Sequence, residues 1–163
     1  MTIKDRISSK LINSEEAKKK IAHWRLKKDH IVFTNGCFDI LHRGHLEYLA
    51  NSADLGNKLI IGLNSDDSVK KIKGDSRPIN DQISRSFALA ALGFIDAIVI
   101  FDEETPEELI KALQPDVLVK GSDYSENEIV GSAFVKKNGG EVKTIPLTEG
   151  FSTTNIIQKI KTL

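Results

Sequence analysis

The sequence predicts a single α/β domain, built on a five-stranded parallel sheet with helices on both faces. Five short apolar runs alternate with segments of helical spacing between residues 30 and 163. Parallel strands joined by helices are buried on both faces, so they read as continuous apolar runs. A length of 163 residues suits one domain with its own core and is too short to expect two.

The strands are expected at the apolar runs, residues 30–35, 58–63, 97–101, 117–120 and 141–147. The helices are expected between and after them, at residues 46–53, 65–72, 80–94, 105–113, 127–140 and 152–160. Ligands of such sheets bind beyond the carboxyl ends of the strands, where the strand order reverses. Four loops should therefore share one rim, residues 35–45, 64–78, 120–126 and 147–154.

Local signals support individual helices. The helix over residues 80–94 is expected from four apolar residues at helical spacing, Ile83, Phe87, Ala90 and Phe94. The helix over residues 105–113 carries three start signals: Thr105 as N-cap, Pro106 as first helical residue and Glu108 as capping-box partner. The helix over residues 127–140 is expected to end at Gly139.

Residues 1–29 are rich in charge and carry a weak helical spacing of apolar side chains, Ile12, Ala17, Ile21 and Trp24. We interpret them as an amphipathic helical segment that covers a face or edge of the domain formed by residues 30–163. Apolar surface around Trp24 would support a homodimer.

Composition excludes several classes of protein. Lys plus Arg and Asp plus Glu both number 23, so bulk charge does not indicate binding to nucleic acid. No apolar run approaches the about 18 residues that a membrane span needs, and no membrane partner is expected. The single cysteine, Cys37, cannot form an internal disulfide, which suits a reducing, cytoplasmic location.

The stretch from Thr34 to Leu49 reads TNGCFDILHRGHLEYL and places His42 and His45 at the mouth of a helix, directly after a strand. The free N–H groups of a first helical turn attract anions, and two imidazoles three residues apart lie on one side of it. Gly36 and Gly44 allow close approach to the backbone. The pattern indicates a polyphosphate site. A zinc site would need three or four ligands, and no metal ligand set is expected.

These residues resemble the HxGH signature of the nucleotidyltransferase superfamily with a Rossmann-like fold, the cytidylyltransferase-like group. The second signature of that group appears as EGFSTTNII, residues 149–157. Further stretches, among them VLVKGSDY, resemble the adenylyltransferases that convert D-glycero-β-D-manno-heptose 1-phosphate and ATP to ADP-heptose and pyrophosphate. The resemblance covers about residues 10–163. Because no sugar kinase fits in the chain, it implies the stand-alone form of this enzyme, acting in surface glycan synthesis of the lipopolysaccharide type.

The resemblance implies a role for each matching residue. His42, His45 and Lys73 are the expected catalytic residues, and all three would contact phosphate. Without the family context, Lys73 is a solvated lysine. The nucleotide is expected at the two strand-to-helix turns and the fourth strand end, on Gly36, Cys37, Phe38, Gly44, Asp123, Ser152, Thr153 and Thr154. Simple N-capping is the alternative for Ser152 and Thr153. The only cofactor expected is Mg²⁺, which enters with ATP.

Asp39 and Arg77 are expected on the acceptor side. Three roles stay open for Asp39: orienting His42, binding a sugar hydroxyl or binding Mg²⁺. Arg77 and Arg85 are candidate phosphate contacts, with surface salt bridges as the alternative. Cys37 is not expected to act as a nucleophile, because the reaction needs no covalent intermediate.

One departure from the group separates the substrate classes. Cytidylyltransferases for choline, ethanolamine and glycerol phosphates usually carry RTEGIST, whereas this chain reads LTEGFST, with Leu147 in place of the arginine. The missing cation favours the heptose branch over the alternative, a cytidylyltransferase for glycerol 3-phosphate or a similar small phosphate. A regulatory protein without turnover is disfavoured, since His42, His45 and Lys73 are all present.

Overall fold

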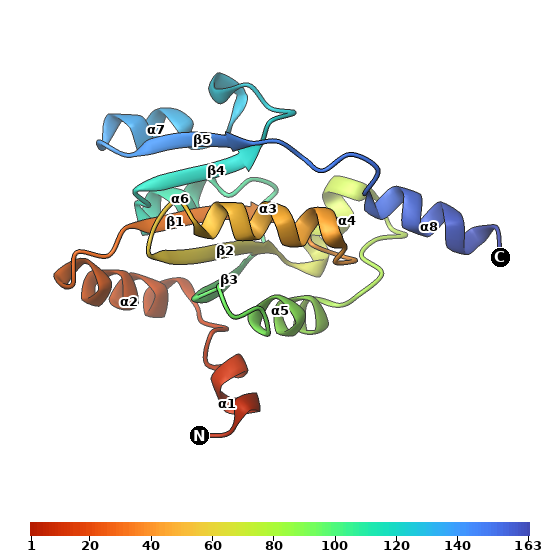
Figure 1. The fold of residues 1–163 in the computed structure, drawn as a ribbon, viewed down its shortest axis with the longest axis horizontal. Helices are drawn as coiled ribbons and strands as arrows, with labels where there is room; N and C mark the ends of the chain where they lie inside the picture. The colour runs from red at the N-terminus through yellow and green to blue at the C-terminus, as the bar shows by residue number, and fades with distance from the viewer.

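A computed structural model describes the whole chain, residues 1–163. Its five strands form one sheet in the order β3-β2-β1-β4-β5, with every pairing parallel (Figure 1). The strands are β1 (Ile31–Gly36), β2 (Lys58–Asn64), β3 (Ala97–Phe101), β4 (Val117–Gly121) and β5 (Glu141–Ile145). The predicted fold class is therefore confirmed.

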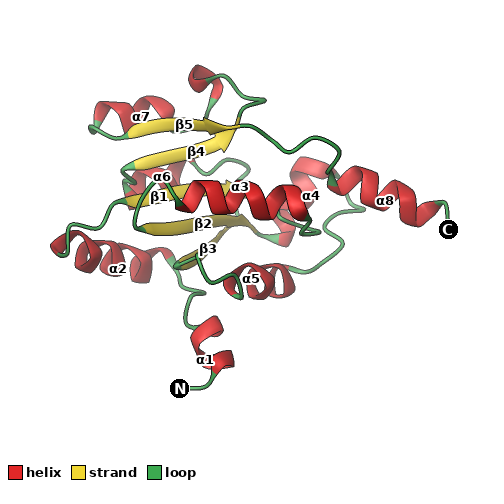
Figure 2. Cartoon of the chain, in the orientation of Figure 1, coloured by secondary structure: helices red, strands yellow, loops and turns green.

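Helices precede, connect and follow these strands (Figure 2). The helices are α1 (Ile3–Ser8), α2 (Ser14–Leu26), α3 (Arg43–Ala53), α4 (Asp66–Lys73), α5 (Gln82–Ala90), α6 (Glu107–Leu113), α7 (Ser132–Lys137) and α8 (Thr153–Lys161), with a 3₁₀ turn η1 (Glu126–Glu128). None of them combines the length and apolar character needed to cross a membrane.

Two apolar clusters cover the two faces of the sheet. Phe33 and Leu118 pack with α2, α6 and α7 in one cluster. Val32 and Val119 pack with α3 and α5 in the other. In Figure 1, α3 lies in front of the sheet and α6 lies behind it. This alternation follows from the two-residue period of a strand, which sends neighbouring side chains to opposite faces.

The strand order reverses beside β1, because β2 and β3 extend the sheet on one side and β4 and β5 on the other. The carboxyl ends of β1 and β4 therefore border the crevice in which ligands of such folds bind. All four loops predicted to share a rim contribute residues to one pocket at this edge. The predicted grouping of the four loops at one edge of the sheet is therefore confirmed, and the function of that edge stays a prediction.

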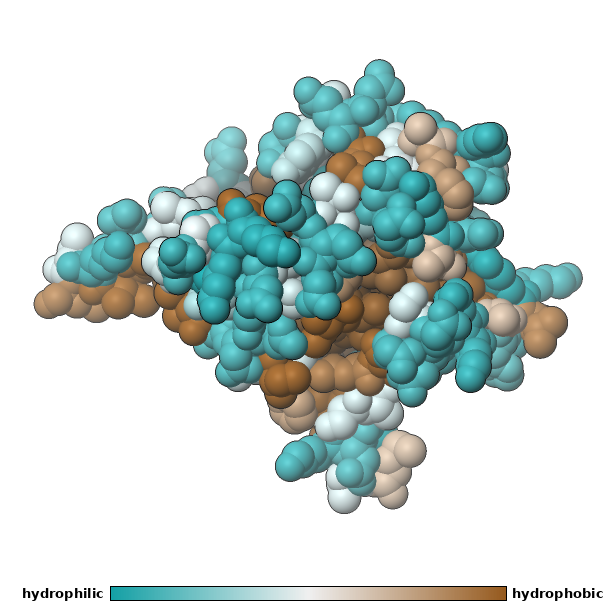
Figure 3. Space-filling view, turned by 180° about the vertical axis from the view of Figure 1, so that it is seen from behind, coloured by the Kyte–Doolittle hydropathy of each residue, from teal (hydrophilic) through white to brown (hydrophobic).

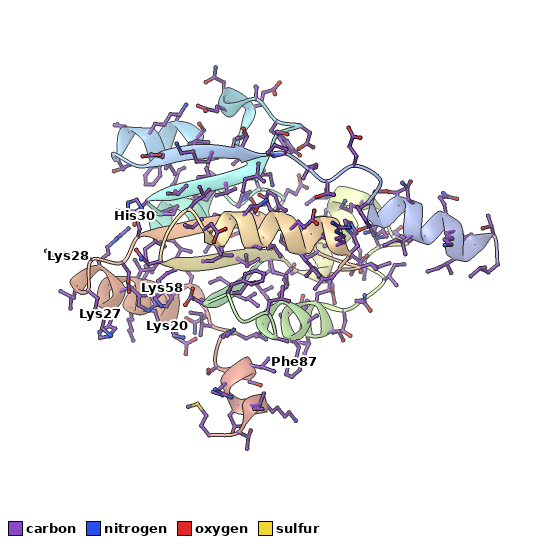
Figure 4. All side chains as sticks on the ribbon, viewed as in Figure 1. Lys20, Lys27, Lys28, His30, Lys58 and Phe87 are labelled. Carbon is purple, nitrogen blue, oxygen red and sulfur yellow. The ribbon has the colours of Figure 1, made fainter.

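The helix α5 is present, but of its predicted apolar stripe only Ala90 is buried. Ile83 is 62% exposed and Phe87 38% exposed, and Phe87 points outward on the side of α1 (Figure 4). Leu89 and Arg85 are buried instead. Apolar periodicity missed this face, because it contains an arginine that hydrogen bonds satisfy.

The start of α6 also differs from the prediction. Pro106 has non-helical backbone angles, and the helix begins one residue later, at Glu107, without a side-chain cap. The predicted capping box of Thr105 and Glu108 is therefore wrong, because the shifted start leaves Thr105 too far from the N–H groups it would cap. Thr105 lines the pocket instead.

The predicted helix over residues 127–140 is broken in two. Gly131 has a φ of +85° and separates η1 from α7. A Cβ on Gly131 would lie 2.7 Å from Ile110 Cδ1, so this turn requires a glycine. The predicted end of the helix is correct, since Gly139 follows the C-cap with a φ of +81°.

The segment 1–29 is helical, and α2 belongs to the core rather than lying apart from it. Ala17 and Ile21 are buried, and Trp24 packs partly buried against the same cluster. Lys58 Nζ lies 5.6 Å from the centre of the Trp24 ring. Figure 4 shows a group of basic side chains at this end of the molecule, away from α8: Lys20, Lys27, Lys28, His30 and Lys58.

The last helix, α8, projects from the body and contains no buried residue. Ile160 is 60% exposed and Leu163 99% exposed. In the view from behind, apolar side chains line the lower edge of this projection (Figure 3). Only the first turn of α8 contributes to the pocket.

Candidate active site

A pocket of about 590 Å³ opens at the carboxyl edge of the sheet. It is lined by every residue predicted for the site: Gly36, Cys37, Phe38, Asp39, His42, Gly44, His45, Lys73, Arg77, Asp123, Ser152, Thr153 and Thr154. The structure thus brings together side chains from four separate loops. Their contacts with substrate stay a prediction.

The two histidines form one stacked unit at the start of α3. Their ring centroids are 3.8 Å apart and their planes differ by 22°. His42 is the N-cap of α3, and its Nδ1 accepts a long hydrogen bond from the backbone N–H of His45, at 3.4 Å. That contact leaves the proton of neutral His42 on Nε2, where it is free to donate to a ligand.

Burial favours the neutral form of both imidazoles. Burial, with a further contribution from the adjacent His42, lowers the pKa of His45 to about 4. Burial also lowers the pKa of His42. His45 Nδ1 is buried without a hydrogen-bond partner. A buried polar atom of this kind would be stabilised by a hydrogen bond to an incoming anion. The turn is suited to oxygen atoms that gain negative charge.

The backbone around the histidines is fixed by close packing. Phe38 has a φ of +44°, a left-handed conformation that non-glycine residues rarely adopt outside functional sites. Its ring meets His45 edge-on at 5.5 Å. A Cβ on Gly44 would lie 3.1 Å from the His42 ring and from Phe151 Cβ, so only glycine leaves room for both.

Phe151 joins the second signature to the first. Its ring lies parallel to His42 with a centroid separation of 6.3 Å, and the Arg43 guanidinium lies 5.7 Å from its centre. Thr148 donates a hydrogen bond to Glu47 of α3. Ser152, the N-cap of α8, accepts from the Asn155 N–H at 3.0 Å, which leaves its own O–H free. The two helix N-termini therefore border one pocket.

Asp39 is almost fully buried and its carboxylate holds the loop after α4. It accepts hydrogen bonds from Arg77 Nε at 2.7 Å and from the backbone N–H groups of Ile79 and Asn80 at 2.8 Å each. Burial acts to raise the pKa of Asp39, but these hydrogen bonds outweigh it and lower the pKa. This geometry favours none of the three roles considered for Asp39, which were orienting His42, binding a sugar hydroxyl and binding Mg²⁺. We assign Asp39 to positioning Arg77 and the loop.

Arg85 is neither a phosphate contact nor a surface ion pair, so both interpretations of it are wrong. It is 2% exposed, and its guanidinium donates to three backbone carbonyls, of Cys37 at 2.7 Å, Asn64 at 2.9 Å and Asn80 at 3.0 Å. It also pairs with Asp66 at 2.8 Å. One side chain thus joins the ends of β1 and β2, the loop after α4 and the start of α4.

Three cations reach the pocket from different elements. Lys73 is the last residue of α4, Arg77 follows in the loop and Lys120 lies near the end of β4. No group of three His, Cys, Asp or Glu side chains is placed to hold a metal ion. Burial raises the pKa of the Cys37 thiol despite the neighbouring Lys73, Arg85 and Arg77, so it is a protonated wall residue rather than a nucleophile.

Sequence reasoning missed two residues that line the site, Lys120 and Tyr48. Lys120 has a sequence signal, because it is a charged residue at the end of an apolar strand. Tyr48 forms the pocket floor: its hydroxyl lies 2.7 Å from Thr34 Oγ1, and burial raises its pKa to about 12. No sequence signal indicated Tyr48.

The fold and the paired phosphate-binding turns define an α/β protein of the nucleotidyltransferase type. Comparison with known families agrees, because the Cytidylyltransferase-like family model matches residues 33–159. The chain belongs to this family.

Individual relatives are similar over most of the chain. The bifunctional protein HldE of Campylobacter fetus is 59% identical over 80% of this chain and 28% of its own length. HldE of Haemophilus influenzae is 50% identical over 94% of this chain and 32% of its own length. The chain thus spans about a third of the curated relatives that it matches.

Solved structures give the same fold. The lipopolysaccharide core biosynthesis protein from Thermoplasma volcanium has a TM-score of 0.61 and 30% identity, covering 74% of this chain and 97% of that one. The pantoate-β-alanine ligase from Francisella tularensis has a TM-score of 0.60 at 12% identity, a likeness of fold alone.

Removing Arg85 should destabilise the protein strongly. Arg85→Met would leave Asp66 and three carbonyls without their donor, an expected loss of about 3–5 kcal/mol in the free energy of unfolding. Arg85→Lys keeps the positive charge but not the several N–H donors of the guanidinium, so its loss in the free energy of unfolding should be intermediate. Chemical denaturation measures both. Arg6→Met, on the exposed surface of α1, is the control, and an equal effect there would disprove the role of Arg85.

The buried histidine should make stability depend on pH. Because the pKa of His45 is about 4 in the folded chain and about 6.5 when unfolded, the unfolded chain binds more protons between these values. The free energy of unfolding should therefore fall as pH is lowered from 6.5 to 4. Denaturation at pH 7 and pH 5 should show a smaller fall for His45→Gln than for the parent. His23→Gln, on the exposed surface of α2, should follow the parent.

Proposed function

We propose that this chain transfers AMP from ATP to D-glycero-β-D-manno-heptose 1-phosphate, giving ADP-heptose and pyrophosphate for surface glycan biosynthesis of the lipopolysaccharide type. The observation that carries the proposal is the convergence of two helix N-termini and three cations on one pocket. The resemblance of VLVKGSDY and its neighbours to the heptose adenylyltransferases supplies the acceptor. The similarity to the lipopolysaccharide core biosynthesis protein from Thermoplasma volcanium supports a role in the same kind of biosynthesis.

In the proposed reaction, an oxygen of the acceptor phosphate attacks the α-phosphorus of ATP. A new P–O bond forms while the bond from the α-phosphorus to the bridging oxygen breaks, and pyrophosphate leaves with the electron pair. The nucleophile is already an anion at neutral pH, so no strong general base is needed. Catalysis then depends on in-line positioning and on neutralising the charge that moves to the leaving group.

The residues of the pocket match these needs. The neutral imidazoles of His42 and His45 supply N–H donors without the repulsion of two adjacent cations. The first turn of α8 offers N–H groups and the hydroxyls of Ser152 and Thr153 to the β- and γ-phosphates. Lys73, at the end of α4, would contact phosphate between donor and acceptor.

Mg²⁺ enters this proposal as part of the substrate Mg·ATP. The pocket carries Asp123 and Asp39, but the carboxylate of Asp39 is occupied by Arg77 and backbone donors. The donor set therefore fits an ion carried mainly by phosphate oxygens rather than one held by a protein cage. When bound, the ion would supply charge neutralisation to the phosphates.

The cellular setting follows from the proposed substrates. ATP and a sugar 1-phosphate are cytoplasmic metabolites, so we place the reaction in the cytoplasm. A homodimer through the surface around Trp24 stays a prediction, and the packing of Trp24 against the core and under Lys58 reduces the apolar area it would offer.

The choice between a heptose adenylyltransferase and a glycerol-phosphate cytidylyltransferase is tested by measuring pyrophosphate release with Mg²⁺. The four pairs of substrates are ATP or CTP with heptose 1-phosphate or glycerol 3-phosphate. We expect turnover with ATP and the heptose, and little with CTP and glycerol 3-phosphate. Leu147 lines the pocket where the alcohol-phosphate enzymes carry a cation. A site that bonds sugar hydroxyls discriminates steeply against an acceptor that lacks them. A kcat/KM for CTP with glycerol 3-phosphate equal to or above that for the expected pair would overturn the branch.

The histidines are tested separately. If they stabilise charge that develops in the transition state, His42→Ala and His45→Ala should each lower kcat by roughly 10²-fold or more. His23→Ala, outside the pocket on α2, is the matched control and should keep kcat. Circular dichroism would check that both site variants are folded. Near-normal kcat in both would remove them from the mechanism.

A further inference from the structure

Lys120 is a partly buried cation without a counter-ion. Its Nζ lies 3.3 Å from Asn35 Oδ1 and 3.5 Å from the Asn35 carbonyl oxygen, to which it donates. The ring of Tyr124 lies 5.5 Å from it. No carboxylate forms an ion pair with it within 4.0 Å, although Asp123 is close enough to act at longer range. Neutral oxygens and a ring are its only direct partners.

Lys120 opens into the side of the pocket opposite the histidines. Leu118, two residues earlier on β4, packs in the cluster of α6 and α7, and Val119 packs in the cluster of α3. Because strand side chains alternate, Lys120 lies on the α6 and α7 side. The pocket continues there along Thr105, Ile129 and Val130. The pocket therefore has an α3 lobe, with the histidines, and an α7 lobe, with Lys120.

Holding a charge in this place costs stability. Burial lowers the pKa of Lys120, against the opposing influence of Cys37 and Asp123, which means that the surroundings disfavour the ammonium. A neutral side chain of similar length would fill the same space without that penalty. A cation that lowers stability, at the wall of the proposed phosphate-binding pocket, indicates that an anionic ligand supplies its counter-ion.

We propose that Lys120 binds a phosphoryl group of the substrates in the α7 lobe. The inference rests on the proposed function and deepens it, because it gives the acceptor phosphate a site of its own. The triphosphate has donors at both helix N-termini, on His42 and at Ser152, whereas Lys120 is the cation on the α7 side. The acceptor phosphate is thus the expected ligand, and a nucleotide phosphate is the other source of the same chemistry.

The test uses Lys120→Met, which keeps length and removes charge, and Lys120→Arg, which restores a cation. Lys143→Met is the matched control, since Lys143 lies on the neighbouring strand β5, is half exposed and pairs with Glu141. Calorimetry measures binding of inorganic phosphate and, separately, of Mg·ATP. Neither isotherm needs turnover, so the result does not depend on which sugar is the acceptor. Thermal unfolding of each variant is recorded alongside.

We expect Lys120→Met to weaken phosphate binding at least tenfold, with Mg·ATP within twofold of the parent, and Lys120→Arg to recover most of the loss. A tenfold loss for Mg·ATP instead would assign the cation to a nucleotide phosphate. The unfolding temperature of Lys120→Met should be equal to or above that of the parent, because a partly buried charge without a counter-ion is removed. A lower unfolding temperature of Lys120→Met with both affinities unchanged would make Lys120 structural and overturn the proposal. An equal loss of phosphate affinity in Lys143→Met would also overturn it.

Discussion

The pocket depends on one buried guanidinium. Arg85 collects the carbonyls of Cys37, Asn64 and Asn80, which lie at or just beyond the ends of β1 and β2 and in the loop after α4. At the carboxyl edge of a parallel sheet such carbonyls no longer have a strand partner, and leaving them buried without donors is costly. Because one planar guanidinium donates to all three carbonyls, it fixes the loops that carry them relative to one another. The positions of Phe38, Asp39 and Arg77 follow from that anchor.

The charges of the pocket are of two kinds. The imidazoles of His42 and His45 are stacked, and burial lowers the pKa of both, with a further contribution from His42 to the lowered pKa of His45. Lys73, Arg77 and Lys120 are basic side chains that come from separate elements. Although the chain has no net charge, basic side chains converge locally at the pocket, which is the arrangement that the proposed polyphosphate substrate requires. The basic side chains at the far end of α2 take no part in it (Figure 4).

The alternation of side chains along β1 and β4 divides the site. One face of the sheet places its pocket-lining residues toward α3 and α8, and the other toward α6 and α7. Under the proposed function, two phosphate-bearing substrates would approach the same sheet edge from opposite sides and meet near the end of β1. This arrangement suits transfer between two anions, which would repel each other if they shared a single cluster of donors.

The sequence alone determined the strands, most of the helices, the grouping of four loops at one sheet edge and the residues of the two signatures, because these depend on local periodicity and short-range motifs. Only the tertiary structure decided the surroundings of Arg85, Asp39 and Lys120. Their partners lie up to 85 residues away in the chain, and whether a charged side chain is buried depends on those partners. The buried face of α5 was missed for the same reason. Apolar periodicity cannot register a polar residue whose burial is compensated by hydrogen bonds from distant loops.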